Sequence, residues 1–140
     1  MQNSNLITVG QNIPGLSFGP IDRAPLALYA GASADHNPVH IDSDLAQKAG
    51  FEDVFAHGLL STAQFGRLIS NWVGPERLVN LETRFIALTQ IGDTITFTGE
   101  VTELFHKNGV EYAQVALAAF RQNGERTLDG KALIGPPSTS

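Results

Sequence analysis

The sequence GLLSTAQFGRLISNWV, residues 58–73, is the longest helical pattern in the chain. Its apolar side chains recur at spacings of three and four, and Phe65 and Leu68 make the remaining surface partly apolar as well. A helix that is apolar on most sides is usually buried on most sides, so other parts of the chain should wrap around it. We expect Ala63 and Gly66 to allow close packing of this helix against a sheet.

Strand patterns follow this helix directly. Apolar and polar residues alternate in four runs, which are residues 78–88, 94–105, 111–121 and 127–134. Asn-Gly pairs at 108–109 and 123–124 separate the last three runs and predict tight hairpin turns, because both residue types tolerate positive backbone angles. The second half of the chain therefore predicts an antiparallel meander.

The first half of the chain carries the remaining helices. Residues 13–21 contain two prolines and two glycines, so we expect only a short or irregular edge strand there. Asp22 is placed to cap a helix that ends near Ala32, and a short helix should run from Ser43 to Gly50. Helices in one half and strands in the other favour an α+β fold, an antiparallel sheet wrapped around one long central helix.

Length and composition limit the possible classes of protein. A chain of 140 residues, 42% hydrophobic and 16% charged, is typical of one soluble globular domain, with a core at about 9–134 and a flexible tail at 135–140. We expect no membrane span and no secretory signal. The absence of cysteine excludes disulfides and favours a cytoplasmic location. The net charge of -5 argues against nucleic-acid binding.

A compact group of acid and base side chains lies before the long helix. Residues 34–42 read ADHNPVHID, and residues 56–58 read AHG. His36 and His40 have the spacing of a helical zinc pair, but Pro38 lies between them and interrupts that helix. The group therefore indicates acid/base catalysis in a loop, and we expect no metal.

These stretches resemble the MaoC-like hydratases and dehydratases, a family that has the hot-dog fold and includes the R-specific enoyl-CoA hydratases. The resemblance rests on residues 29–42, 51–56 and 57–59, extends from about Val9 to Leu133, and includes Gly92-Asp93-Thr94 at the start of a strand. It implies a single hot-dog domain that adds water reversibly to a trans-2-enoyl thioester, as an R-specific enoyl-CoA hydratase or (3R)-hydroxyacyl thioester dehydratase. One departure is Leu88-Thr89, where related chains often have a proline-containing turn.

The same resemblance assigns the site residues. Asp35 and His40 match the catalytic pair, which activates water, and either one can be the base. Asn37 matches the motif residue that holds the turn or the water. Gly58 supplies a backbone N–H for the developing oxyanion, helped by the helix dipole, and His57 shapes the glycine turn. The coenzyme A or acyl-carrier group is part of the substrate, so no cofactor is expected.

The resemblance also suggests binding partners, and two other functions are compatible with the fold. Hot-dog domains pair sheets edge to edge, so a homodimer or higher homo-oligomer is expected. Arg67, Arg84 and Lys131 are candidate phosphate contacts, although such residues are more often solvated surface groups. The acyl pocket should involve residues behind the catalytic turn. Two other functions remain open: a hot-dog acyl-CoA thioesterase, and a non-catalytic acyl-binding subunit of a heteromeric hydratase.

Overall fold

The computed structural model describes residues 6–22, 43–50 and 58–137. Most of the helix predicted from Asp22 to Ala32 lies outside these residues. The described elements, in chain order, are β1 (Asn12–Phe18), α2 (Ser43–Lys48), α3 (Gly58–Val73), the 3-10 helix η2 (Pro75–Arg77), β2 (Leu78–Phe85), β3 (Ile95–Lys107), β4 (Val110–Phe120) and β5 (Arg126–Ile134). These helices and strands, in this order, confirm the predicted α+β class.

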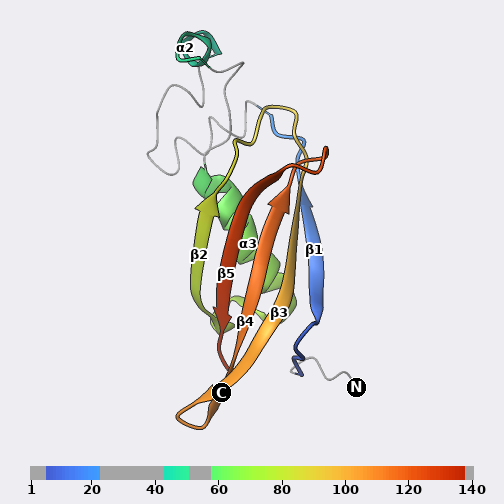
Figure 1. The fold of residues 1–140 in the computed structure, drawn as a ribbon, viewed down its shortest axis with the longest axis vertical. Coiled ribbons are helices and arrows are strands. Elements are labelled where there is room, and N and C mark those ends of the chain that lie inside the picture. The colour runs from blue at the N-terminus through green and yellow to red at the C-terminus, as the bar shows by residue number, and fades with distance from the viewer. Residues whose placement is uncertain (1–5, 23–42, 51–57, 138–140) are drawn as a thin grey trace.

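The five strands form one antiparallel sheet in the order β1-β3-β4-β5-β2 (Figure 1). Strands β3, β4 and β5 are joined by hairpins, whereas β1 and β2 join the sheet from distant parts of the sequence and form its two edges. The predicted irregular edge strand is β1, whose register shifts between Ile13 and Leu16, where Pro14 and Gly15 interrupt regular pairing.

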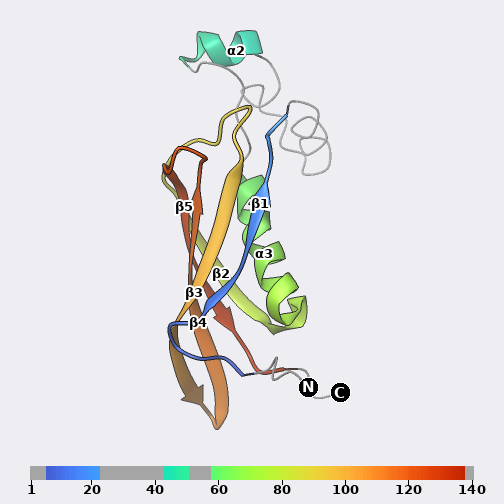
Figure 2. The same cartoon turned by 90° about the vertical axis from the view of Figure 1, so that its right-hand side faces the viewer.

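Helix α3 lies along one face of the twisted sheet (Figure 2). Its residues Phe65, Leu68 and Ile69 are buried against the inward side chains of the strands, so the predicted central helix and antiparallel sheet are confirmed. Ala63 is exposed, and a Cβ built on Gly66 would meet nothing within 4 Å. The prediction that these two small residues contact the sheet is therefore wrong, because they do not lie on the buried face of the helix.

The two Asn-Gly pairs behave differently. Asn108 and Gly109 both have positive φ, 54° and 78°, as a two-residue hairpin turn between β3 and β4 requires. In the second pair only Gly124 has a positive φ, 89°, and the side chain of Asn123 accepts a hydrogen bond from the backbone N–H of Glu125. The turn between β4 and β5 is therefore longer than the one between β3 and β4.

Strand β2 is shorter and more exposed than its pattern predicts. It ends at Phe85 instead of reaching residue 88, because the N–H groups of Ile86 and Ala87 both donate to the carbonyl of Thr127 and so leave the regular ladder. Val79 and Phe85 are 56% and 57% exposed, although their alternation predicted an inward face. Val79 lies at the register shift between Leu78 and Asn80, which interrupts the alternation, and Phe85 is the last residue of this edge strand.

Candidate active site

Four of the five predicted site residues, Asp35, Asn37, His40 and His57, lie outside the described residues. The fifth, Gly58, is the first residue of α3. The beginning of α3 lies at the end of the sheet where β1 ends and where β2 is joined to β3 (Figures 1 and 2). Near this end, the hydroxyls of Thr62 and Thr83 lie 3.4 Å apart and connect α3 to β2.

The first turn of α3 suits a negatively charged ligand. The first N–H groups of any α-helix have no acceptor within the helix, and the helix dipole makes that end positive. No acidic side chain occupies the first turn of α3, so none compensates this charge from within the turn. A glycine at the first position also leaves the backbone open to close approach. The oxyanion role of the Gly58 N–H stays a prediction, because the other predicted site residues lie outside the described chain.

A buried carboxylate organises the connection between β2 and β3. Asp93 is 2% exposed and accepts hydrogen bonds from the backbone N–H of Gln90 (2.7 Å), from Nε and Nη2 of Arg121 (2.8 and 3.1 Å) and from Nε2 of Gln122 (3.0 Å). Burial alone would raise the pKa of Asp93, but these hydrogen bonds together lower that pKa below its ordinary value. Asp93 is therefore a charged, fully partnered side chain that holds the turn at residues 90–93.

Little in the sequence indicated this cluster. Gly92-Asp93-Thr94 appeared only as part of a family resemblance, and Arg121 is 28 residues away on the other side of β3 and β4. A charged residue next to a strand pattern is usually solvated, so the type and position of Arg121 do not indicate a buried partner. The register of the hairpin between β3 and β4 is the signal that brings the two residues to the same end of the sheet.

Two of the candidate phosphate contacts, Arg84 and Lys131, line one groove on the sheet, whereas Arg67 lies on α3. Arg84 pairs with Asp129 at 2.9 Å, and Arg126 also donates to that carboxylate. Burial favours a higher pKa for Asp129, yet the hydrogen bonds from Arg84 and Arg126 lower the pKa overall. Arg67 is exposed on α3 and donates weakly to Gln64 at 3.4 Å. Arg84 is thus largely neutralised, which favours the surface interpretation.

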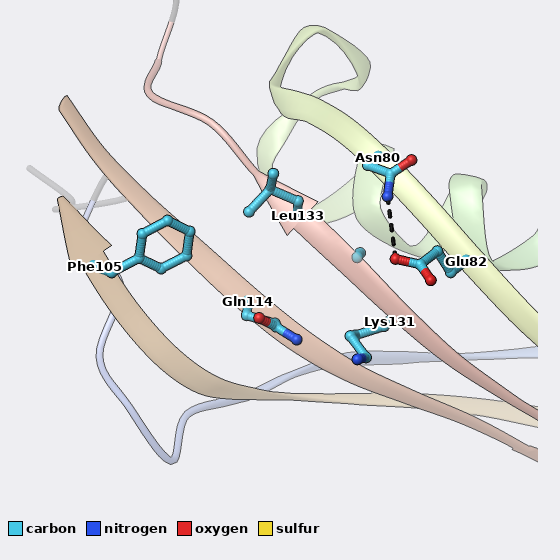
Figure 3. A pocket seen from close by; sticks show the side chains of 7 residues that line it. Asn80, Glu82, Phe105, Gln114, Lys131 and Leu133 are labelled. Carbon is cyan, nitrogen blue, oxygen red and sulfur yellow. Dashed lines mark hydrogen bonds between the residues drawn. The ribbon is translucent and has the colours of Figure 1, made fainter. Parts of the chain in front are cut away.

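The groove shown in Figure 3 includes Lys131, one of the candidate phosphate contacts. It has a volume of about 300 Å³ and is lined by Asn80, Glu82, Phe105, Gln114, Lys131, Ala132 and Leu133. The labelled side chains stand on the face of the sheet that is turned away from α3 (Figure 3). Opposite charges at Glu82 and Lys131 and two amides give this groove no single electrostatic preference.

Neither a metal cluster nor a membrane-spanning helix is found in the described ranges. Within residues 6–22, 43–50 and 58–137, no group of three or more His, Asp or Glu side chains is arranged to hold a metal ion. No helix in that part of the chain is long and apolar enough to cross a membrane.

Comparison with known proteins identifies the family. Residues 8–119 match the family described as MaoC like domain. The chain is 33% identical over 121 residues to an (R)-specific enoyl-CoA hydratase from Rhodospirillum rubrum, covering 84% of this chain and 81% of the relative. It is 36% identical over 99 residues to a 3-oxo-4,17-pregnadiene-20-carboxyl-CoA hydratase beta subunit from Mycobacterium tuberculosis, covering 69% and 75%.

The fold is likewise found in solved structures. The R-hydratase PhaJ1 from Pseudomonas aeruginosa superimposes with a TM-score of 0.83 at 30% identity, covering 94% of this chain and 83% of that one. With a family match over most of its length and a closely superimposable hydratase structure, the chain belongs to the MaoC-like hydratase and dehydratase family and has its hot-dog fold.

Proposed function

We propose that this chain is an R-specific enoyl thioester hydratase, which also catalyses the reverse dehydration of a (3R)-hydroxyacyl thioester. The observation that carries the proposal is the 33% identity to an (R)-specific enoyl-CoA hydratase across more than four-fifths of both chains. The first turn of α3, without an acidic side chain and beginning at Gly58, adds independent physical support.

The reaction assigns a distinct task to each candidate residue. In the hydration direction, the Asp35/His40 pair removes a proton from water as the oxygen attacks carbon 3, and a proton is delivered to carbon 2. Electron density moves onto the thioester oxygen during the attack, and the N–H of Gly58 stabilises this charge. Asn37 holds the turn or the water, and His57 shapes the turn before Gly58. The net change is one water added across one double bond.

The direct test measures loss of enoyl absorbance with a panel of enoyl-CoA thioesters. We expect Asp35→Asn and His40→Gln each to lower turnover by about 100-fold or more, because acid/base groups contribute on that scale. Circular dichroism should show that both variants remain folded. Wild-type turnover in either variant would refute the assignment.

The same assay separates the two other functions. A thioesterase would direct water to the carbonyl carbon and release free coenzyme A while the enoyl absorbance persisted. The heteromeric alternative has one specific observation in its favour, which is the 36% identity to a protein named as a hydratase beta subunit. A purified chain that is inactive alone and gains activity only with a second, different subunit would support this alternative over ours.

The proposal includes no metal and no cofactor beyond the thioester itself. The thioester carbonyl already activates the double bond, and a helix N-terminus provides the electrophilic contact. Dialysis against EDTA should therefore leave turnover unchanged, whereas loss of turnover that is restored by added metal would contradict this part.

We also propose a cytoplasmic location, based on the absence of cysteine, and cell fractionation tests it directly.

A homodimer paired through β2 completes the proposal. Four apolar side chains are exposed on this edge strand and on the connection that follows it: Val79, Phe85, Ile86 and Leu88. An uncovered edge strand with apolar side chains is a template for pairing with another chain. A second copy of the same chain would satisfy both the strand edge and these side chains.

A further inference from the structure

The chain that leads into residues 23–42 is docked on the turn at residues 90–93. The N–H of Ile21 donates to the carbonyl of Asp93 at 2.8 Å, and the N–H of Gly92 donates to the carbonyl of Ile21 at 2.8 Å. Both backbone groups of Ile21 are therefore used by this turn, and its side chain is buried, with 6% exposed. Ile21 cannot slide along the turn without losing both hydrogen bonds.

Gly19 shows how close this approach is. A Cβ at Gly19 would lie 2.5 Å from the carbonyl oxygen of Asp93 and 2.9 Å from Cα of Thr94. Such contacts are shorter than backbone atoms allow, and the φ of 133° at Gly19 is also unfavourable for other residues. The segment before residue 23 thus lies backbone against backbone on the turn.

The Asp93 carboxylate holds the turn at residues 90–93 in place. Besides accepting from Gln90, this carboxylate receives two hydrogen bonds from Arg121, whose third contact is to Glu125 at 2.6 Å. Gln122 reinforces the arrangement by donating to Asp93 and accepting from the N–H of Thr94 at 2.9 Å. Three segments are joined here: the exit from β1, the connection between β2 and β3, and the turn between β4 and β5.

The hydrogen bonds of this ion pair impose one geometry on the turn. Asp93 is buried, whereas the side chain of Arg121 is 22% exposed. Among the described residues Asp93 is the only buried carboxylate. It belongs to the connection between β2 and β3, and this connection lies at the end of the sheet where α3 begins (Figure 1).

We propose that Arg121 is a positioning residue for the hydratase reaction: by binding Asp93 it fixes the point from which the segment carrying Asp35 and His40 leaves the sheet. The inference rests on the proposed function. Catalysis requires reacting groups to be placed within fractions of an ångström, so a shift at the start of that segment lowers turnover more than it lowers substrate affinity.

The test compares four variants at equal concentration of folded protein. Arg121→Ala removes both contacts to Asp93, Arg121→Lys keeps the charge and one donor, and Gln122→Ala removes one weaker contact. Glu125→Gln is the matched control, because it changes the exposed partner of Arg121 and leaves Asp93 paired. We measure kcat and KM with an enoyl-CoA, and amide hydrogen exchange at Ile21 and Gly92.

We expect kcat to fall about 10- to 100-fold in Arg121→Ala, with KM changed much less. Arg121→Lys should recover part of the loss, Gln122→Ala should show a smaller fall, and Glu125→Gln should resemble the wild type. Exchange at Ile21 and Gly92 should accelerate in Arg121→Ala while the amides of β4 stay protected. If Arg121→Ala fails to fold, Arg121→Lys and Gln122→Ala provide the same comparison.

Three results would overturn the inference: an unchanged kcat in folded Arg121→Ala, an equal loss in Glu125→Gln, or exchange that accelerates uniformly throughout the sheet. The last would assign Arg121 a purely structural role. A wild-type protein that hydrates no enoyl thioester would instead refute the proposed function. In that case the exchange measurement alone decides whether Arg121 holds the start of the segment.

Discussion

Phe65 of α3 meets Phe97 of β3 edge to face, with ring centroids 5.4 Å apart and ring planes at 90°. Both side chains are completely buried. This contact connects the middle of the helix to the middle strands of the sheet, and Phe65 also approaches the space above Gly130 of β5. The position of α3, and with it the position of Gly58, depends on this contact.

Truncation of Phe65 should therefore destabilise the whole fold. Phe65→Ala leaves a cavity beside Phe97, and we expect a loss of about 3–5 kcal/mol in the free energy of unfolding, measured by urea denaturation. Phe105→Ala is the matched control, because Phe105 stacks on Tyr112 in the partly exposed hairpin between β3 and β4. The loss in the free energy of unfolding should be clearly smaller for Phe105→Ala. Equal losses would contradict the central role of Phe65.

Two glycines should respond to alanine in opposite directions. A Cβ at Gly130 would lie 3.2 Å from the carbonyl oxygen of Glu82, from Cβ of Leu117 and from Cε2 of Phe65, so Gly130→Ala overpacks the helix–sheet interface. We expect a loss of about 1–3 kcal/mol. Gly66 lies within α3 with open space around it, so Gly66→Ala should stabilise the protein by about 0.5–1 kcal/mol. Thermal unfolding of both variants will show whether Gly130→Ala lowers the stability and Gly66→Ala raises it.

The Asp93 carboxylate and its hydrogen-bond partners should make the stability of the fold depend on pH. The pKa of Asp93 is lowered in the folded state. The contribution of Asp93 to the free energy of unfolding is therefore present above its unfolded pKa of about 3.9 and is lost as the pH falls through its folded pKa. The difference in Tm between wild type and Asp93→Asn should thus shrink as the pH is lowered from about 6 toward about 3. Asp129→Asn, at a more exposed pair, should show a smaller difference because solvent screens it. A pH-independent difference for Asp93→Asn would contradict the argument.

Charge on the edge strand should disrupt the proposed dimer. Phe85→Lys places a cation where the apolar edge of β2 would meet a second copy, so we expect a monomer by sedimentation velocity at micromolar concentration. Glu103→Lys, on the exposed surface of the interior strand β3, is the control and should leave the assembly unchanged. A Phe85→Lys protein that sediments like the wild type would rule out pairing through β2.

Local sequence patterns predicted the helices, strands and turns. The features that they did not predict depend on strand pairing between distant parts of the chain. The apolar period of α3 and the Asn108-Gly109 turn are properties of a few adjacent residues, and both appear as expected. Exposure of Phe85 and burial of Asp93 depend on which strands lie at the edges and on a partner 28 residues away. Of the site residues, only Gly58 falls within the described chain, and the roles of Asp35 and His40 stay predictions.

The strand order also has a consequence for the path of folding. Strands β3, β4 and β5 pair with their neighbours in sequence and close short loops, whereas β1 pairs with β3 and β2 with β5 across long stretches of chain. Short loops close first, so we expect the β3–β4–β5 hairpins to form early and β1 to dock late. Pulse-labelled exchange would reveal this order, with β4 protected before β1. The segment that carries the candidate catalytic pair is bounded by β1, so the reactive centre would mature only after the C-terminal hairpins have formed.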